Sequence, residues 1–406
     1  MPCSPWCGAL VVGLALVVPA KAADWRQFRG TATTSVADDA PLLTSWSESE
    51  NIAWKADLPG RGLSSPIVVR DNVVVTCSSG YHQDRLHVLC FNAANGTLRW
   101  ERQFWATGRT ISHPKTCVAS SSPASDGQRI FALYSSNDLA CLDLNGELQW
   151  YRGLTVDFPN ASNSLGMASS PVFAGNTLVV QVENDSQQSL AVGINPLTGE
   201  SRWTMQRPSR ANWTSPAVMP GSNPDDDVVL LQSSAGISAI NPLTGAELWK
   251  YTDGAATIPS SAVQGRTLYA VSHGITALHF PAGSANVEQL WRAERLNPAT
   301  ASPVAYGERL YLLNGAGVLV CADLKDGAVT WQLRLEGPFT SSPVVAKDHL
   351  YAFNEAGIGQ VVKLGDERGE VVGRGELNDL ILATPAIANG ALYVRSDKTL
   401  WKIAAK

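Results

Sequence analysis

The stretch INPLTGAELW, from Ile240 to Trp249, decides the fold because the chain holds an almost identical copy one repeat earlier. The copy is INPLTGESRW, from Ile194 to Trp203. Each predicts a strand, a tight turn and a second strand that ends in Trp. The turn needs a residue that tolerates positive φ, which Gly199 and Gly245 provide. A unit that recurs at this period indicates a repeat architecture.

Small residues followed by proline open the repeats. Proline cannot donate to a strand ladder, so it belongs on an edge strand, such as the innermost strand of a propeller blade, or at the first residue of a strand. A hairpin and an apolar β-branched strand follow, and a third strand leads into the glycine turn. The eight openings are Ser64-Ser65-Pro66, Ser121-Ser122-Pro123, Ser169-Ser170-Pro171, Thr214-Ser215-Pro216, Pro259-Ser260-Ser261, Ala301-Ser302-Pro303, Ser341-Ser342-Pro343 and Ala383-Thr384-Pro385.

The two ends of the chain complement each other. The closing tryptophans are Trp54, Trp100, Trp150, Trp203, Trp249, Trp291 and Trp331, and the seventh complete unit has Val371-Val372 at the expected place. Trp54 closes a unit without its first three strands, whereas residues 385–403 open a unit without its fourth. Residues 51–56 should therefore pair with residues 399–404. We predict an all-β chain that forms an eight-bladed β-propeller of four-stranded blades, closed by the N-terminal strand, with about 44 residues per blade.

Residues 1–22 are interpreted as a secretory signal peptide. Ala9 to Val18 is an apolar run, and Ala20-Lys21-Ala22 offers a small-x-small cleavage site. As a helix the run would cover only about 15 Å of a roughly 30 Å hydrocarbon core, which disfavours a membrane anchor. We expect export to the periplasm or cell envelope, with no transmembrane segment after cleavage.

Residues 23–50 show no strand periodicity. We expect them to form an extended strap that lies on the propeller, which spans residues 51–406, and to be held by Trp25, Phe28 and Trp46.

Composition fits a turn-rich β protein and argues against nucleic acid as a partner. The chain is 45% hydrophobic and 17% charged, with 34 Gly and 13 Trp. Its formal net charge is −5, and its acids and bases are scattered without a basic run.

The cysteines suggest packing rather than chemistry. Cys90, Cys141 and Cys321 share one repeat position, where other units place Gly or Ala, so we expect buried, reduced thiols. Cys77 and Cys117 lie near one rim on neighbouring blades and are the only pair for which we allow a disulfide. No pair has the spacing of a metal or haem site.

The motifs S-S-P-V and L-x-A-x-(D/N)-x-x-T-G-x-x-x-W together resemble the pyrroloquinoline-quinone-like β-propeller repeat family. The lead-in W-x-Q-F-R-G, from Trp25 to Gly30, is similar to an exported bacterial branch whose members are often named after the outer-membrane assembly factor BamB. The resemblance implies an eight-bladed propeller with its closing tryptophans docked between blades. It does not imply one activity.

The sequence lacks residues that a quinone-dependent dehydrogenase would need. Quinone-dependent dehydrogenases of this family hold the cofactor over a Trp and under a vicinal Cys-Cys disulfide, beside calcium and an Asp base, and this chain has no Cys-Cys pair. Asp225-Asp226-Asp227 fits a solvated loop better than a calcium site. We therefore predict no cofactor, metal or catalytic residue, and keep a dehydrogenase or another propeller enzyme as the alternative.

The remaining hypothesis is a non-catalytic scaffold of the cell envelope that binds an envelope protein, with outer-membrane protein assembly as its process. The connections 101–120 and 151–168 are the longest, and the hairpin loop 78–85 should share their face. The residues expected there to bind a partner are Tyr81, His82, Arg109, His113, Lys115, Phe158 and Asn160. This aromatic and basic set favours an acidic partner surface. Alternatively, these loops only cap the channel mouth.

Overall fold

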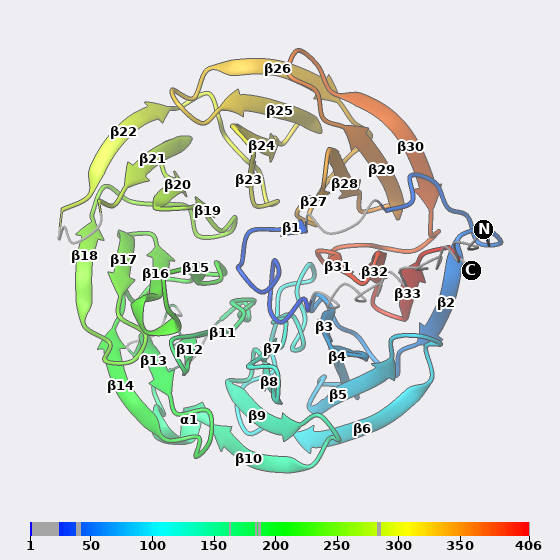
Figure 1. Ribbon diagram of the computed structural model, residues 1–406. Helices are drawn as coiled ribbons and strands as arrows, with labels where there is room; N and C mark the ends of the chain where they lie inside the picture. Colours follow the sequence, from blue (N-terminus) through cyan, green and yellow to red (C-terminus); the bar gives the residue numbers. More distant parts are fainter. Residues whose placement is uncertain are drawn as a thin grey trace.

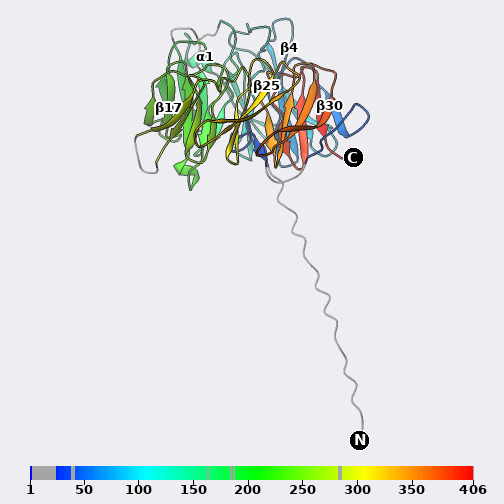
Figure 2. The same ribbon diagram turned by 90° about the horizontal axis from the view of Figure 1, so that it is seen from above.

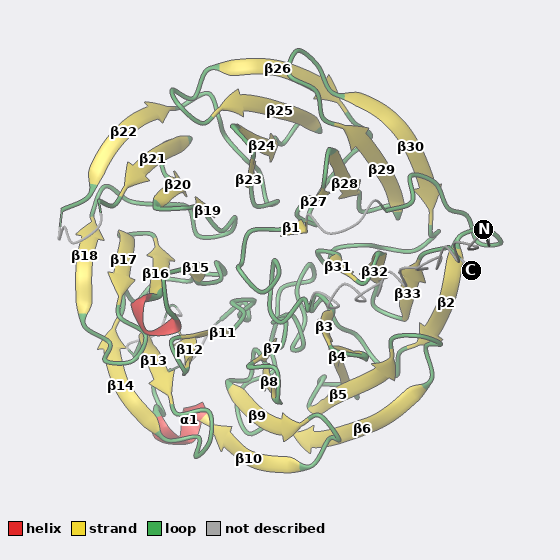
Figure 3. Cartoon of the chain, in the orientation of Figure 1, coloured by secondary structure: helices red, strands yellow, loops and turns green. Residues whose placement is uncertain are grey.

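The computed structural model describes Met1 and residues 24–37, 42–161, 164–182, 185, 188–281 and 286–405. Apart from Met1, the predicted signal peptide lies outside these residues. The described strands form eight sheets around a common axis, as Figure 1 shows, which confirms the predicted propeller. In the described part of the chain, helix is limited to α1 (Leu154–Asp157) and η1 (Pro224–Asp226), the red segments of Figure 3. No helix in this part is long and apolar enough to cross a bilayer.

Each of the first four blades contributes four antiparallel strands, innermost first. Blade 1 has β3 (Ile67–Val69), β4 (Asn72–Ser79), β5 (Arg85–Asn92) and β6 (Leu98–Trp105). Blade 2 has β7 (Ala124–Ser125), β8 (Arg129–Leu133), β9 (Asp138–Asp143) and β10 (Leu148–Gly153). Blade 3 has β11 (Val172–Ala174), β12 (Thr177–Val182), β13 (Leu190–Ile194) and β14 (Ser201–Gln206). Blade 4 has β15 (Ala217–Met219), β16 (Val228–Ser233), β17 (Gly236–Ile240) and β18 (Glu247–Tyr251).

The remaining blades repeat this order until the ends of the chain meet. Blade 5 has β19 (Ala262–Gln264), β20 (Thr267–Val271), β21 (Ile275–His279) and β22 (Glu288–Ala293). Blade 6 has β23 (Val304–Tyr306), β24 (Arg309–Leu313), β25 (Val318–Asp323) and β26 (Val329–Arg334). Blade 7 has β27 (Val344–Ala346), β28 (His349–Phe353), β29 (Ile358–Lys363) and β30 (Glu370–Glu376). Blade 8 has β31 (Ala386–Ala388), β32 (Ala391–Arg395), β33 (Thr399–Ile403) and β2 (Ile52–Asp57).

The N-terminal strand closes the ring as predicted. β2 pairs antiparallel with β33, with Ile52 opposite Ile403 and Asp57 opposite Thr399. The first and last strands of the propeller therefore lie in one sheet, which removes two exposed sheet edges.

The closing tryptophans dock on the following blade, and this contact explains the glycine turns. Trp203 Nε1 donates to the Pro242 carbonyl at 2.8 Å. The turn glycine lies under the ring, since a Cβ on Gly245 would stand 2.5 Å from the Trp203 indole. Gly245 also has a φ of 72°, so both conformation and space require glycine. The equivalent donors are Trp54, Trp100, Trp150, Trp291 and Trp331.

Blade 7 lacks a closing tryptophan, as the sequence pattern indicated. The residue that stands in its place is not the one that the pattern indicated. Strand register puts Gly373 opposite Val361, the place that Trp331 takes opposite Cys321 in blade 6. The prediction that Val371-Val372 fill this position is therefore wrong. The equivalent residue stands four places after the turn glycine in both blades, Trp331 after Gly327 and Gly373 after Gly369, but the turn before that glycine is two residues longer in blade 7.

The strap fills the gap in blade 7. A Cβ on Gly373 would stand 1.8 Å from the Thr44 carbonyl oxygen. Trp46 is buried, forms a parallel bridge with Gly375 and stacks on Phe353 with ring centroids 5.5 Å apart. A tryptophan from the strap thus packs where the blade supplies none.

The structure separates the five cysteines after the predicted cleavage site into two groups, all buried free thiols. Cys90, Cys141 and Cys321 lie opposite closing tryptophans, which confirms that they are small core residues. Burial raises the pKa of Cys90 and Cys141 to about 12 and that of Cys321 to about 11. The disulfide allowed between Cys77 and Cys117 is not formed. Cys77 Sγ accepts a hydrogen bond from Arg395 Nη2, and Cys117 Sγ accepts one from Ser120 Oγ, each at 3.6 Å.

Candidate functional site

Hydroxyl groups line the central channel in an almost closed belt. In blades 2 to 8, the residue two places before the first strand accepts a hydrogen bond from the equivalent backbone N–H of the preceding blade, from 2.8 Å between Ser65 N and Ser122 Oγ to 3.1 Å between Ser342 N and Thr384 Oγ1. The intervening members are Ser170, Ser215, Ser260 and Ser302. The S-S-P openings are therefore conserved within the repeat because they link neighbouring blades.

The strap closes one end of the channel. In Figure 1 the blue N-terminal segment crosses the centre of the ring, and β1 (Val36–Ala37) adds in parallel to β27. Arg29 is 2% exposed and donates to the Ser261 carbonyl at 2.8 Å, to the Pro303 carbonyl and to Ser35 Oγ at 2.9 Å. Burial lowers its pKa to about 10. The sequence pattern predicted neither this arginine nor a strand in the strap.

A cavity of about 420 Å³ lies between the strap and the opposite mouth of the channel. Phe28 lines it from the strap, the hydroxyl belt forms part of its wall, and His113, Lys115 and Trp213 lie nearer the mouth. Asp and Glu are absent from the described lining residues.

The predicted partner-binding residues divide between the rim and the channel mouth. Tyr81 is 96% exposed and packs edge-on against His82, and Arg109 and Asn160 are exposed. His113 and Lys115 line the cavity instead. Lys115 Nζ reaches Glu355 of blade 7 at 2.9 Å.

Phe158 differs from the other predicted residues. It is half-buried and packs against the apolar core between blades 2 and 3, so it positions α1 rather than presenting a free ring.

Three segments on one face form a continuous rim, defined here as residues 80–85, 105–120 and 154–168, with 162–163 outside the described residues. Val118 N donates to Gln83 Oε1 at 3.2 Å, and His113 N donates to the Leu165 carbonyl at 2.8 Å. Figure 2 shows α1 and the loop end of β4 on the same side of the ring. The rim therefore both surrounds the channel mouth and offers an outward surface.

The structure adds rim residues that the sequence did not single out. Trp105, at the end of β6, is 63% exposed, and the Arg85 guanidinium lies 5.0 Å from its ring centroid. Ile111 and Val156 are also exposed. The sequence feature that could have revealed these residues is the length of strands β5 and β6. Both strands extend past those of the other blades and place Arg85 opposite Trp105.

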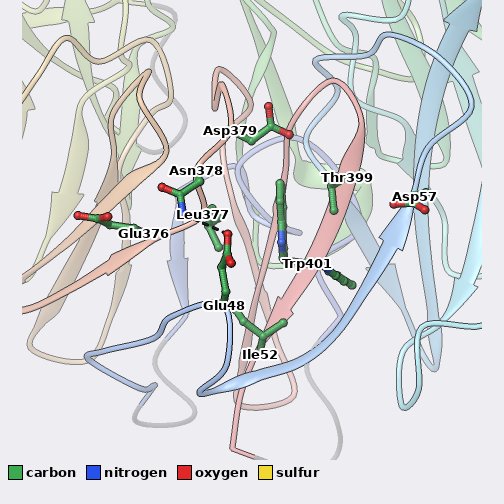
Figure 4. A pocket seen from close by; sticks show the side chains of 10 residues that line it. Glu48, Ile52, Asp57, Glu376, Leu377, Asn378, Asp379, Thr399 and Trp401 are labelled. Atoms are coloured by element: carbon green, nitrogen blue, oxygen red, sulfur yellow. Dashed lines mark hydrogen bonds between the residues drawn. The ribbon is translucent and has the colours of Figure 1, made fainter.

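A second cavity, of about 230 Å³, lies at the seam between blades 7 and 8 (Figure 4). Glu48, Glu376 and Asp379 line it beside Trp401. Asn378 Nδ2 donates to Glu48 Oε1 at 3.1 Å, which ties the strap to this seam.

The residues present do not fit the quinone and calcium pair of the dehydrogenases. In the described part of the chain, no group of three or more His, Cys, Asp or Glu side chains is placed to hold a metal ion. No vicinal cysteine pair stands over the channel, because the sequence contains none.

Comparison with known sequences gives one family and one partial relative. The family described as "Outer membrane protein assembly factor BamB" matches residues 23–166, 88–287 and 283–358. The beta-alanine-activating enzyme of Danio rerio is 36% identical over 127 residues, which are 31% of this chain and only 10% of that protein.

Solved structures share the fold at low identity. BamB from Moraxella catarrhalis has a TM-score of 0.60 at 15% identity, covering 86% of this chain and 96% of that one. A europium-containing methanol dehydrogenase has a TM-score of 0.68 at 13% identity, with 92% and 89% covered. The quinohemoprotein alcohol dehydrogenase from Comamonas testosteroni has 0.67 at 12%, with 94% and 81% covered. These likenesses concern the fold alone.

Proposed function

Because the chain belongs to the family described as the outer membrane protein assembly factor BamB, we propose that it is a non-catalytic binding scaffold of the bacterial cell envelope. It is exported, works in the periplasm or envelope, and binds an envelope protein in outer-membrane protein assembly. The quinone-dependent dehydrogenase is the alternative, and the fold that it shares with this chain does not distinguish the two.

The exposed aromatic and apolar side chains of the rim are the observation that carries this proposal. Tyr81, Trp105, Ile111 and Val156 are all large and exposed, and they stand on segments tied to one another and to rigid blades. Exposed side chains of this kind, gathered on one face, mark protein interaction sites, and Tyr, Trp and Arg are the residues that most often anchor them.

Charge indicates the nature of the partner. Arg85 and Arg109 accompany the aromatic residues, although the protein as a whole has a formal net charge of −5. Asp84 and Asp157 stand on the same rim, so these arginines are single anchors for acidic groups of a partner and do not form a broad basic surface.

Site-specific crosslinking in the native host tests the scaffold. A photo-crosslinking amino acid at Tyr81 or Trp105 should give a covalent product with an envelope protein that mass spectrometry identifies. The controls are Leu197 and Leu243, which are apolar and 61% and 45% exposed but lie in the turns between the third and fourth strands, on the opposite face of the ring.

The loops supply a second test. Shortening only the exposed stretches, residues 109–115 and 159–160, and keeping the buried Cys117, Val118, Leu154 and Met167, should preserve the blades and abolish capture of the crosslinked partner. Equal crosslinking from both faces, or unchanged affinity after shortening, would show that the rim is not the binding face.

A further inference from the structure

A serine, a histidine and a glutamate form a hydrogen-bonded line at the rim end of blade 1. Ser79 Oγ lies 2.7 Å from His87 Nε2, and His87 Nδ1 lies 2.6 Å from Glu101 Oε1. A carboxylate only accepts, so Nδ1–H donates to Glu101, and Nε2 is left to accept the Ser79 hydroxyl proton. The order is that of a nucleophile, a general base and a group that orients the base.

Strand pairing holds these three side chains together. β4 pairs with β5 so that Ser79 lies opposite Arg85, and β5 pairs with β6 so that His87 lies opposite Gln103. Side chains alternate between faces along each strand, so Ser79, His87 and Glu101 share one face. Each contact runs diagonally to the next strand. The arrangement therefore stands on a rigid sheet rather than on a loop.

The histidine is more deeply buried than the serine, as a general base beside an accessible nucleophile should be. His87 is 3% exposed, whereas Ser79 is only half-buried at the end of its strand. Gln103 Nε2 donates to Glu101 Oε1 at 2.9 Å and so fixes the carboxylate. A shielded base beside a reachable hydroxyl keeps water from competing for Nε2 and strengthens both hydrogen bonds.

The surroundings of Ser79 indicate the class of substrate. Gly80 has a φ of 86° and turns the chain directly after the serine. The backbone N–H groups of Tyr81 and His82 follow in this turn, and ester hydrolysis at Ser79 would need one of them as its oxyanion donor. Trp105 offers a flat apolar surface on the same face of the sheet. These groups suit a short carboxylic ester with an apolar or aromatic part.

We propose that Ser79, His87 and Glu101 form a catalytic triad that hydrolyses such esters. Ser79 Oγ bonds to the carbonyl carbon as its proton moves to His87 Nε2. The C–O bond to the alcohol then breaks, and the alcohol leaves with that proton. Water attacks the acyl-serine in the same way, which releases the carboxylic acid and restores the hydroxyl. One ester and one water thus give one acid and one alcohol.

This activity does not rest on the scaffold function but goes beyond it: with an active triad the protein is a scaffold that also carries a catalytic site, and not a non-catalytic one. Its reacting groups are Ser79, His87 and Glu101, none of which is an anchor of the scaffold, although both proposals use Trp105. Failure of one test leaves the other unaffected.

A fluorophosphonate probe and 4-nitrophenyl butyrate test the triad on the full mature chain. Phosphonylation releases HF, so the peptide that contains Ser79 should gain the mass of one probe less HF. Ser79→Ala should abolish the label and lower ester hydrolysis by at least about a hundredfold. Ser78→Ala is the matched control, because its neighbouring hydroxyl bonds to Arg61 O and Gln83 Oε1 instead of to the histidine.

Glu101 acts through His87, so it is a positioning residue and needs its own measurement. Glu101→Gln should lower kcat about tenfold or more with KM unchanged, and Glu101→Asp should restore part of kcat. Circular dichroism melting shows that each variant is folded. The proposal is overturned if the folded wild type leaves Ser79 unlabelled, or if Ser79→Ala hydrolyses the ester as fast as Ser78→Ala.

Discussion

At the residue scale, glycine and tryptophan act as a pair between blades. Gly245 combines a positive φ with a Cβ position 2.5 Å from the Trp203 ring. Gly245→Ala should therefore destabilise the protein by about 2–4 kcal/mol, from backbone strain plus overpacking. Gly265→Ala is the matched control, because Gly265 has a φ of 56° but nothing within 4 Å of its Cβ position. It should cost only about 1 kcal/mol. Urea midpoints measure both, and equal losses would contradict the docking argument.

The thiols give a second prediction at this scale. Burial raises the folded-state pKa of Cys90 and Cys141 to about 12, above the ordinary value of about 8.5. Between these values the folded state keeps a proton that the unfolded state loses, so these thiols favour folding at pH 8 and lose that contribution as pH rises toward 12. Native protein at pH 8 should not react with a thiol reagent, whereas protein in guanidinium should react at every thiol. Rapid native labelling of Cys90 would contradict this.

At the element scale, the strap completes blade 7. Trp46→Ala should cost about 3–5 kcal/mol, as for a buried core aromatic, although Trp46 lies outside every repeat. Trp105→Ala should change stability by less than about 0.5 kcal/mol, because that ring is mostly exposed. Thermal or denaturant unfolding of the two variants checks this, and similar losses would mean that the strap packs only weakly.

The contacts of the strap could not be predicted from the sequence, whereas the blades could. The openings, the glycine turns and the closing tryptophans follow local rules of strand and turn chemistry, so eight blades and their closure could be predicted. Arg29, β1 and the place of Trp46 depend on which blades the strap crosses, and no periodicity marks those contacts. The same limit applies to Ser79, His87 and Glu101, which meet only through the register of three strands.

Only part of the rim could be predicted, because its contacts, like those of the strap, leave no periodic pattern in the sequence. Unusually long connections marked the face, and Tyr81, His82 and Arg109 lie on it as exposed side chains. Length alone could not tell which loop residues turn inward. His113 and Lys115 line the cavity, and Phe158 packs into the core.

At the scale of the whole molecule, the ring depends on its last strand. Truncation after residue 398 removes β33 and leaves β2 without a partner. We expect the truncated protein to unfold without a single cooperative transition and to have a larger hydrodynamic radius. Removal of residues 405–406 alone is the control and should change neither. A cooperative, compact truncated form would mean that seven blades can close by themselves.

The quinone provides the second test at this scale. We expect no dye reduction with alcohols or aldoses when the protein is incubated with pyrroloquinoline quinone and Ca²⁺, because the residues of the dehydrogenase site are missing. Robust turnover would overturn the scaffold proposal and favour the dehydrogenase.

Because β2 and β33 stand at opposite ends of the propeller sequence, the ring can close only late in synthesis. Ile52–Asp57 leaves the ribosome among the first residues of the propeller, and its partner Thr399–Ile403 is among the last. For nearly the whole of translation the growing chain therefore carries a strand whose hydrogen bonds cannot yet be made, and an unpaired strand edge invites pairing with other chains. Native closure cannot precede the emergence of Thr399–Ile403, so a secretion route that accepts unfolded polypeptide would deliver the chain before the ring locks.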